Sequence, residues 1–168
     1  MPRFTALAGG DQASYRLAAL FQMTYPGAPC IYYGDEIGLA GGKRDYPEAS
    51  RRSFPWDTSL WDQELLNYIK RLTALRRERP ELRTGDFISV YAQGQIYAYL
   101  RSQGAAQSLV VINNGDVDFD KSLPVASQLA DGSRWQGLLE GKNAMVHTGQ
   151  LSGFRLAPRS AEILSLQG

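Results

Sequence analysis

Hydrophobic residues in the first half of the chain recur at helical spacing in two places. Residues 12–23 follow Asp11, whose carboxylate can accept the unsatisfied amides of a first helical turn, and Pro26 ends the segment. Between Asp62 and Arg79, apolar side chains recur every three or four positions, and arginines gather near the C-terminal end, where they favour the helix dipole. The pattern therefore predicts two main helices.

The stretch between these helices contains one apolar run and one long polar connection. Residues 28–34 form a short, continuous apolar and aromatic run, which is typical of a strand buried on both faces of a parallel sheet. Residues 34–61 show no periodicity, and a connection of more than about 15 residues is usually functional or disordered. We expect one buried strand and one long loop. A lone parallel strand needs neighbours on both edges, so this half has the character of the end of a larger α/β domain.

From about residue 85 onward, the hydrophobic pattern changes from helical spacing to alternation, and turns rich in Gly and Asn separate the runs. Such spacing predicts an antiparallel β-sandwich. We therefore expect an α+β protein with two domains, residues 1–82 and 83–168. The alternating or short apolar runs are 87–91, 96–100, 109–112, 123–125, 135–139, 145–147 and 161–166.

The charge balance excludes several classes of partner. The chain has 18 Lys and Arg against 17 Asp and Glu, and neither half carries the basic surplus that nucleic-acid binding requires. The longest uncharged run, residues 17–34, is interrupted by Pro26 and Pro29, so we expect no membrane span. No signal peptide is recognisable, and we expect a cytoplasmic protein.

The sequence contains few cysteine or histidine residues that could bind a metal ion or a cofactor. The single cysteine, Cys30, excludes an internal disulfide and a cysteine-cluster metal site. The single histidine, His147, excludes a histidine-based metal site or a catalytic triad within this chain. We expect no metal and no cofactor, and any chemistry must rest on carboxylates, arginines and aromatic side chains.

Three segments resemble one family of enzymes. Residues 25–38 read YPGAPCIYYGDEIG, and Gly41-Gly42 and then RRSFPW at residues 51–56 follow them. This run resembles the last barrel strand and following loop of the α-amylase superfamily, glycoside hydrolase family 13, closest to neopullulanases, cyclomaltodextrinases and maltogenic amylases. Residues 2–4 resemble the segment just after that family's His-Asp motif, and residues 156–164 resemble the closing strand of its C-terminal domain. The resemblance implies the last part of a (β/α)₈ barrel followed by a β-sandwich.

The resemblance also implies a chemistry and a substrate class. The family cleaves α-glucosidic bonds in maltooligosaccharides, cyclodextrins or pullulan with retention, and retaining enzymes use two carboxyl groups about 5–5.5 Å apart. In this family those two residues and a third, stabilising carboxylate follow barrel strands four, five and seven. The aligned part of this chain begins after all three, because the last of them falls at or just before Met1. We expect no catalytic residues here and no activity of the chain alone.

Four residues are expected to bind substrate. The family carries an Asp-Pro-x-x-Arg pattern in this loop, whose Asp and Arg hydrogen-bond to sugar hydroxyls. Arg51 matches the pattern, whereas Asp45 departs from it, because Pro47 stands four residues before Arg51 and Tyr46 separates it from Asp45. Tyr33 ends the predicted strand and can face the cleft, and Tyr46 can stack on a sugar. The competing interpretation of the loop is a solvated, charged surface.

Other residues near this loop favour structural roles. Phe54, Trp56 and Trp61 can line a glucan cleft, but an aromatic cluster beside a helix is more typical of packing. Asp35 and Glu36 are adjacent, so on a strand they would point to opposite faces, and we expect them to anchor the strand–loop junction. Arg3 lies close to the expected position of the third carboxylate, where it either orients that group or bridges the core.

A second class of function remains open. The chain can act as a sugar-binding or interaction module that oligomerises or pairs with a separate chain carrying the rest of a barrel. Exposed strand edges favour such pairing, and we expect the isolated chain to self-associate.

Overall fold

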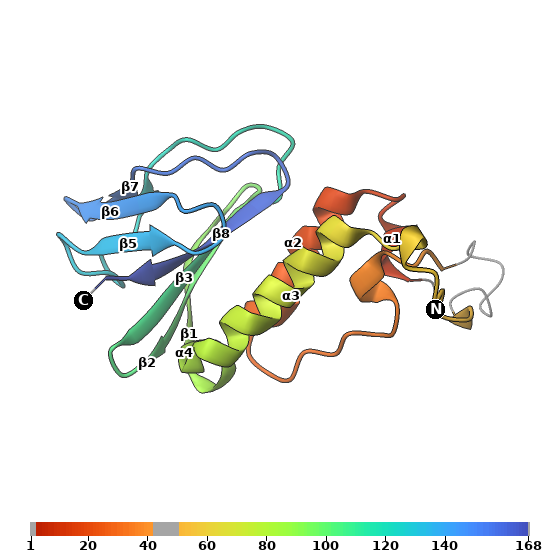
Figure 1. The fold of residues 1–168 in the computed structure, drawn as a ribbon. Coiled ribbons are helices and arrows are strands. Elements are labelled where there is room, and N and C mark those ends of the chain that lie inside the picture. The colour runs from red at the N-terminus through yellow and green to blue at the C-terminus, as the bar shows by residue number, and fades with distance from the viewer. Residues whose placement is uncertain (1–2, 42–50, 168) are drawn as a thin grey trace.

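The computed structural model describes residues 3–41 and 51–167 (Figure 1). Its helical elements lie in the first half of the chain and its strands in the second, which confirms the α+β class. The helices are α1 (Phe4–Leu7), α2 (Gln12–Thr24), α3 (Gln63–Glu78) and α4 (Pro80–Thr84), with 3₁₀ turns η1 (Asp35–Ile37) and η3 (Thr58–Leu60). The strands are β1 (Asp86–Gln93), β2 (Ile96–Gln103), β3 (Ala106–Asn113), β4 (Leu123–Pro124), β5 (Arg134–Gly137), β6 (Asn143–His147), β7 (Gln150–Ser152) and β8 (Ser160–Leu166).

Both predicted main helices are confirmed, together with the residues that begin them. The carboxylate of Asp11 accepts a hydrogen bond from the amide of Ala13 at 3.0 Å, so it caps α2. The carboxylate of Asp62 accepts from the amide of Leu65 at 2.9 Å and caps α3 in the same way. Each cap satisfies an amide that the helix itself leaves without a partner.

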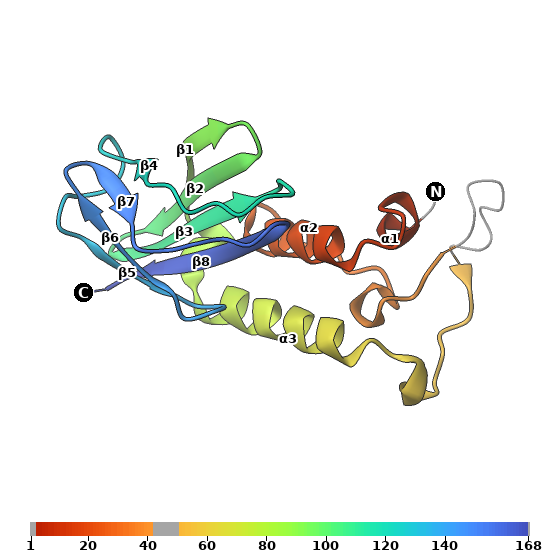
Figure 2. The same cartoon turned by 90° about the horizontal axis from the view of Figure 1, so that it is seen from above.

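The predicted antiparallel β-domain is also confirmed. Its eight strands form one sheet in the order β1-β2-β3-β8-β5-β6-β7-β4, and every pairing is antiparallel. The sheet curls, so that β2 and β3 face β5, β6 and β7 across a shared core (Figure 2). The two layers expected of a sandwich are therefore two parts of one continuous sheet.

Alternation along the strands separates two hydrophobic clusters. In β3, Leu109 and Val111 point to the inside of the curled sheet, and Val110 and Ile112 point to its outer face. Helices α2 and α3 cover that outer face with Leu20, Ile69 and neighbouring side chains (Figures 1 and 2). The helical half and the sheet thus share one core, and the boundary expected between residues 82 and 83 falls within α4 and stays a prediction.

The buried strand predicted around residues 31–33 is wrong. Residues 28–32 are assigned to no strand, and Ile31 is 40% exposed. A parallel strand requires hydrogen-bonding neighbours along its edges, and no described segment pairs with this one. Instead, the segment is attached to α2 through the Gln22 side chain, which donates to the carbonyl oxygen of Cys30 at 2.7 Å.

Two buried arginines join the helices to the sheet. Arg76 of α3 donates to the carbonyl oxygens of Met23 and Leu82, both at 2.7 Å. Arg101 of β2 donates to the carbonyl oxygen of Thr24 at 2.6 Å and also reaches Leu82 at 3.2 Å. Burial lowers the pKa of both guanidinium groups. Both arginines therefore stabilise carbonyl groups at the C-terminal end of α2, where the helix dipole favours positive charge.

Candidate functional site

Arg3 organises the end of the molecule at which the predicted sugar-binding residues lie. Its side chain is buried and donates to the carboxylate of Asp35 at 2.6 Å and to the carbonyl oxygen of Tyr33 at 2.8 Å. Its guanidinium carbon also lies 4.7 Å from the ring centre of Tyr32 and 4.9 Å from that of Tyr33, within the range of cation–π attraction. Of the two roles considered for Arg3, the structure shows the bridging one.

Asp35 and Glu36 lie in a tight turn, η1, that glycines on both sides make possible. Gly34 precedes the η1 turn with φ +84°, and Gly38 follows it with φ +73°, both in the left-handed region that favours glycine. The hydroxyl of Tyr15 in α2 donates to the carbonyl oxygen of Asp35 at 2.9 Å and secures the turn from the other side. Burial raises the pKa of the Tyr15 hydroxyl, so this donor keeps its proton. The anchoring role expected for Asp35 is thereby observed.

The structure brings two of the four predicted binding residues to the same place. Tyr33 is 39% exposed, and its hydroxyl donates to the carbonyl oxygen of Arg52 at 2.9 Å, directly beside Arg51. Desolvation raises the pKa of the neighbouring Tyr32, while the charges of Arg3 and Arg51 oppose that rise. Arg51 is exposed and therefore available to a ligand. Whether Tyr33 and Arg51 contact sugar stays a prediction.

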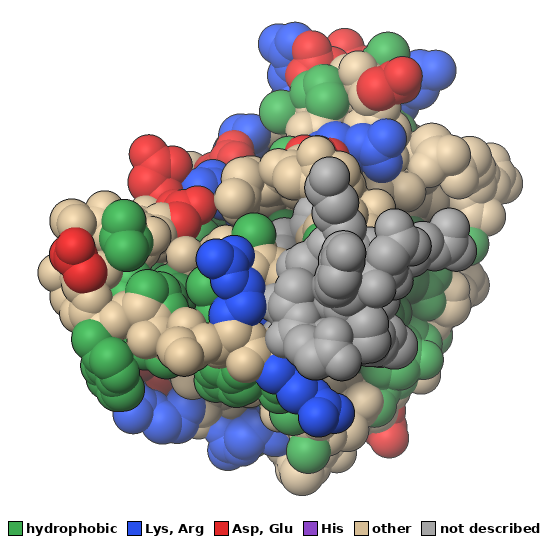
Figure 3. Space-filling model, turned by 90° about the vertical axis from the view of Figure 1, so that its right-hand side faces the viewer, with side chains coloured by type: hydrophobic (Ala, Val, Ile, Leu, Met, Phe, Trp, Pro, Cys, Tyr) green, Lys and Arg blue, Asp and Glu red, His purple; other side chains and the backbone are tan. Residues whose placement is uncertain are grey.

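The other two predicted binding residues, Asp45 and Tyr46, lie outside the described residues. In Figure 3, which views this end of the molecule, Lys and Arg side chains are interspersed among apolar ones. The described part of the chain contains no group of three or more His, Cys, Asp or Glu side chains placed to hold a metal ion. Nor does any helix within residues 3–41 and 51–167 have the length and apolarity needed to cross a membrane.

The aromatic residues after the loop divide into packed and exposed members. Trp61 is partly buried, and its indole nitrogen donates to the carbonyl oxygen of Pro55 at 2.7 Å. The ring of Phe54 lies 5.7 Å from that of Trp61 and 4.9 Å from that of Trp56, measured between centres. Trp56 itself is 83% exposed, so the expectation of a packed core residue is wrong for it. An exposed indole supported by Phe54 is a flat apolar surface, and the sequence pattern alone does not show it.

Two family models match the chain and together account for most of it. The catalytic domain of α-amylase matches residues 1–64, and the neopullulanase-like C-terminal domain matches residues 87–164. The class defined by the fold and these matches is the end of a glycoside hydrolase catalytic domain joined to an all-β domain. The chain belongs to the α-amylase superfamily, as its sequence resemblance indicated, and its C-terminal domain is of the neopullulanase-like type.

Characterised relatives support the same assignment. Neopullulanase 2 of Thermoactinomyces vulgaris is 37% identical over 164 residues, which cover 96% of this chain and 27% of the relative. A cyclomaltodextrinase of Thermoanaerobacter pseudethanolicus is 40% identical over 112 residues, covering 67% of this chain and 19% of that enzyme. The chain therefore spans about a fifth to a quarter of the length of these relatives.

Solved structures show the same fold. The debranching enzyme of Nostoc punctiforme matches with a TM-score of 0.80 and 38% identity, over 98% of this chain and 33% of that chain. An α-amylase of Geobacillus thermoleovorans, solved in complex with acarbose, matches with a TM-score of 0.86 and 29% identity, over 99% of this chain and 37% of that chain. The expected fold, the end of an α-amylase catalytic domain followed by an antiparallel β-domain, is confirmed.

Proposed function

We propose that this chain supplies the C-terminal, non-catalytic part of an α-glucan hydrolase and does not hydrolyse glucans by itself. The observation that carries this proposal is the state of Asp35, whose carboxylate is engaged by buried Arg3 at 2.6 Å. Glu36 follows directly in the same 3₁₀ turn. Retaining hydrolysis instead needs two carboxyl groups that face each other across the scissile bond at about 5–5.5 Å. Asp35 is held in an ion pair that anchors the turn, and two carboxylates adjacent in one turn do not form the opposed pair that retaining hydrolysis needs.

The exposed side chains at this end are suited to hold a glucan. Arg51 offers charged donors to sugar hydroxyls, the Tyr33 ring lies near it through the bond to Arg52, and Trp56 offers an exposed indole in the same loop. Asp45 and Tyr46 belong to the same loop in sequence. The names of the relatives, cyclomaltodextrinase and neopullulanase, support maltooligosaccharides, cyclodextrins and pullulan as the ligand class.

Titration with β-cyclodextrin tests the binding half of this proposal. We expect Arg51→Ala to weaken binding about tenfold, because hydrogen bonds to a charged donor contribute about 1.5–3 kcal/mol. Trp56→Ala removes the exposed indole and should weaken binding as well. Arg134→Ala, an exposed arginine in β5, serves as the control. Equal affinity of all four proteins would refute contact through this loop.

A specific observation favours a second role, that of an interaction module. Leu60 is 68% exposed and Trp56 is 83% exposed, and the apolar segment at residues 28–32 has no sheet partner among the described residues. Large exposed apolar side chains are candidates for association surfaces. Self-association of the isolated chain, or pairing with a separate barrel chain, would cover them.

A further inference from the structure

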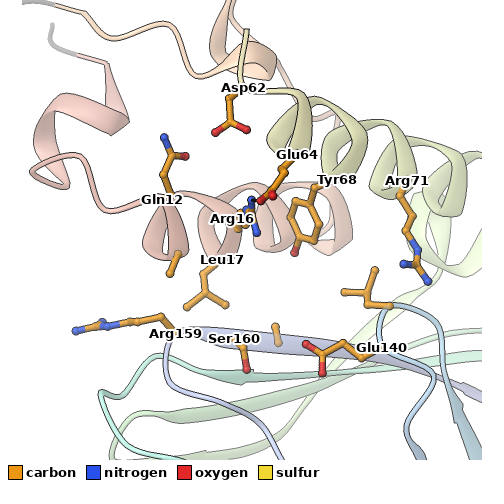
Figure 4. Close-up of a pocket in the computed structure, with 13 residues that line it drawn as sticks. Gln12, Arg16, Leu17, Asp62, Glu64, Tyr68, Arg71, Glu140, Arg159 and Ser160 are labelled. Atoms are coloured by element: carbon orange, nitrogen blue, oxygen red, sulfur yellow. Dashed lines mark hydrogen bonds and ion pairs between the residues drawn. The ribbon is translucent and has the colours of Figure 1, made fainter.

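A groove separates the N-terminal halves of α2 and α3 from the first residues of β8, away from Arg51 and Trp56. It encloses about 580 Å³, within the range of about 300–1,000 Å³ typical of small-molecule sites. Figure 4 shows Tyr68 of α3 and Glu140, in the loop after β5, pointing into the gap between the helices and the sheet, whereas Arg159 points away from it. We propose that this groove binds a neutral oligosaccharide, a segment of α-glucan, as a second sugar site.

The charge of the groove favours a neutral ligand. Three arginines and three carboxylates contribute to its lining, and although the guanidinium of Arg159 points outward, Arg16 and Arg71 leave a formal excess of only one negative charge. An anion or a cation entering the groove would meet groups of its own sign as well as the opposite one. A polyhydroxyl ligand, by contrast, uses donors and acceptors together, because each sugar hydroxyl both donates and accepts. The charged lining residues are Arg16, Arg71, Arg159, Asp62, Glu64 and Glu140.

Two polar groups in the groove have hydrogen-bonding capacity left over. Arg16 donates from Nη2 to Glu64 at 3.0 Å, but its Nε is shielded from solvent and has no hydrogen-bond partner among the described residues. No hydrogen bond of the Tyr68 hydroxyl to another described residue is found, although Arg16 lies 6.0 Å from its ring centre. Burial raises the pKa of Tyr68, so this hydroxyl remains a donor. The Tyr68 hydroxyl is therefore a donor that a ligand hydroxyl can meet, whereas the shielded Nε of Arg16 is a costly group, unpaired among the described residues, that solvent does not reach.

The opposite wall is held in place before any ligand arrives. The buried carboxylate of Glu162 accepts hydrogen bonds from the amides of Leu139 at 2.7 Å and Glu140 at 2.9 Å. Arg71 of α3 donates across the groove to the carbonyl oxygen of Leu138. One carboxylate oxygen of Glu140 contacts the ammonium of Lys142 at 2.5 Å, and the second can accept from a sugar hydroxyl. A fixed wall lowers the entropy lost on binding.

The choice of α-glucan over other neutral sugars rests on the proposed function of the chain. Isothermal titration with maltotriose, and with cellotriose as its β-linked counterpart, tests the groove. Tyr68→Phe removes only a hydroxyl, so we expect about two- to tenfold weaker maltotriose binding, and about tenfold weaker binding for Glu140→Gln. Tyr91→Phe, on the inner side of the sheet, and Glu78→Gln, exposed at the end of α3, are matched controls and should bind as the unchanged chain does.

Three results would overturn the groove site. These are no maltotriose binding by the unchanged chain, equal affinity for cellotriose, and binding that Arg51→Ala abolishes while Tyr68→Phe and Glu140→Gln leave it intact. The last result would place the sugar at the loop and would keep the proposed function. Failure of the proposed function would be seen differently, as release of new reducing ends by the chain. That result does not depend on Tyr68 or Glu140, so the two failures can be told apart.

Discussion

At the scale of single residues, the join between helices and sheet depends on guanidinium groups bonded to backbone carbonyls. Arg101 is fully buried in β2 and donates to Thr24 at 2.6 Å and to Gly85 at 2.9 Å. A lysine at this position would keep the charge but would lose the fork that reaches several carbonyls at once. Arg101 therefore acts as a positional link rather than as half of an ion pair.

Replacing Arg101 by Lys should lower the free energy of unfolding by about 3 kcal/mol, the size expected when charged hydrogen bonds are lost in a buried site. Urea denaturation followed by circular dichroism measures the change. Arg134→Lys, at an exposed position in β5, should stay within about 0.5 kcal/mol of the unchanged chain. Equal losses in the two variants would show that the fork of Arg101 contributes nothing specific.

Buried tyrosines make stability sensitive to alkaline pH. Burial raises the pKa of Tyr99, whose hydroxyl lies 2.5 Å from Thr24 Oγ1, far above its ordinary value of 10.0. Above about pH 10 the unfolded chain loses this proton while the folded chain keeps it, so stability falls as pH rises. Each such group contributes a slope of up to about 1.4 kcal/mol per pH unit.

Tyr99→Phe should therefore give a shallower alkaline decline than the unchanged chain. The slope will not vanish, because the pKa values of Tyr15 and Tyr68 are raised by burial too. Unfolding by urea at a series of pH values from about 9 to about 11 gives both slopes. Identical slopes would mean that Tyr99 ionises as easily in the folded chain as in the unfolded one.

The candidate site was predictable from sequence only in part. A motif indicates Arg51, whereas Tyr33 was expected only from its place at the end of a strand that the structure does not form. The Tyr33 hydroxyl donates to the carbonyl oxygen of Arg52, the residue next to Arg51. The exposure of Trp56 was not predictable, because an aromatic residue near a helix looks the same in sequence whether it packs or projects. The ion pair of Arg3 with Asp35 joins residues 32 positions apart, a separation at which local pattern carries no signal.

At the scale of elements, prediction succeeded where hydrogen bonds are local or the strands are adjacent in sequence. Helices α2 and α3 satisfy their own backbone groups, and the hairpins β1–β2 and β2–β3 pair consecutive strands, so spacing alone identifies them. The apolar run near Ile31 failed because a parallel strand depends on neighbours that its own sequence does not specify. The short strand β7 was missed because three residues are too few to display alternation.

Gly34, which precedes η1, allows a test of whether a glycine is required to position this turn. A Cβ on Gly34 would lie 2.6 Å from the Leu39 side chain and would also force φ +84° on alanine. Gly94, in the β1–β2 hairpin, has φ +58° but open space around it. Gly94→Ala should thus lower the free energy of unfolding by about 1–2 kcal/mol, from backbone strain alone. Gly34→Ala should lower it by more, because the clash with Leu39 adds to the strain. If urea unfolding shows the same loss of stability in both variants, the Leu39 side chain moves aside without an energetic cost.

At the scale of the whole molecule, most of the large apolar side chains that are exposed in the described residues lie in the helical half. Sedimentation velocity at increasing protein concentration should show an average mass above that of one chain. Leu60→Ser should reduce this association, whereas Val117→Ser, 69% exposed in the β-domain, should not. A monomer at every concentration would refute self-association.

We propose that this chain contacts α-glucans without cleaving them. The most direct test is to incubate it with maltotriose, measure binding by isothermal titration and count reducing ends in the same samples. We expect heat of binding with no new reducing ends beyond those formed in buffer. An increase in reducing ends that scales with protein concentration would contradict it, because carboxylates of this chain would then have to act as nucleophile and acid.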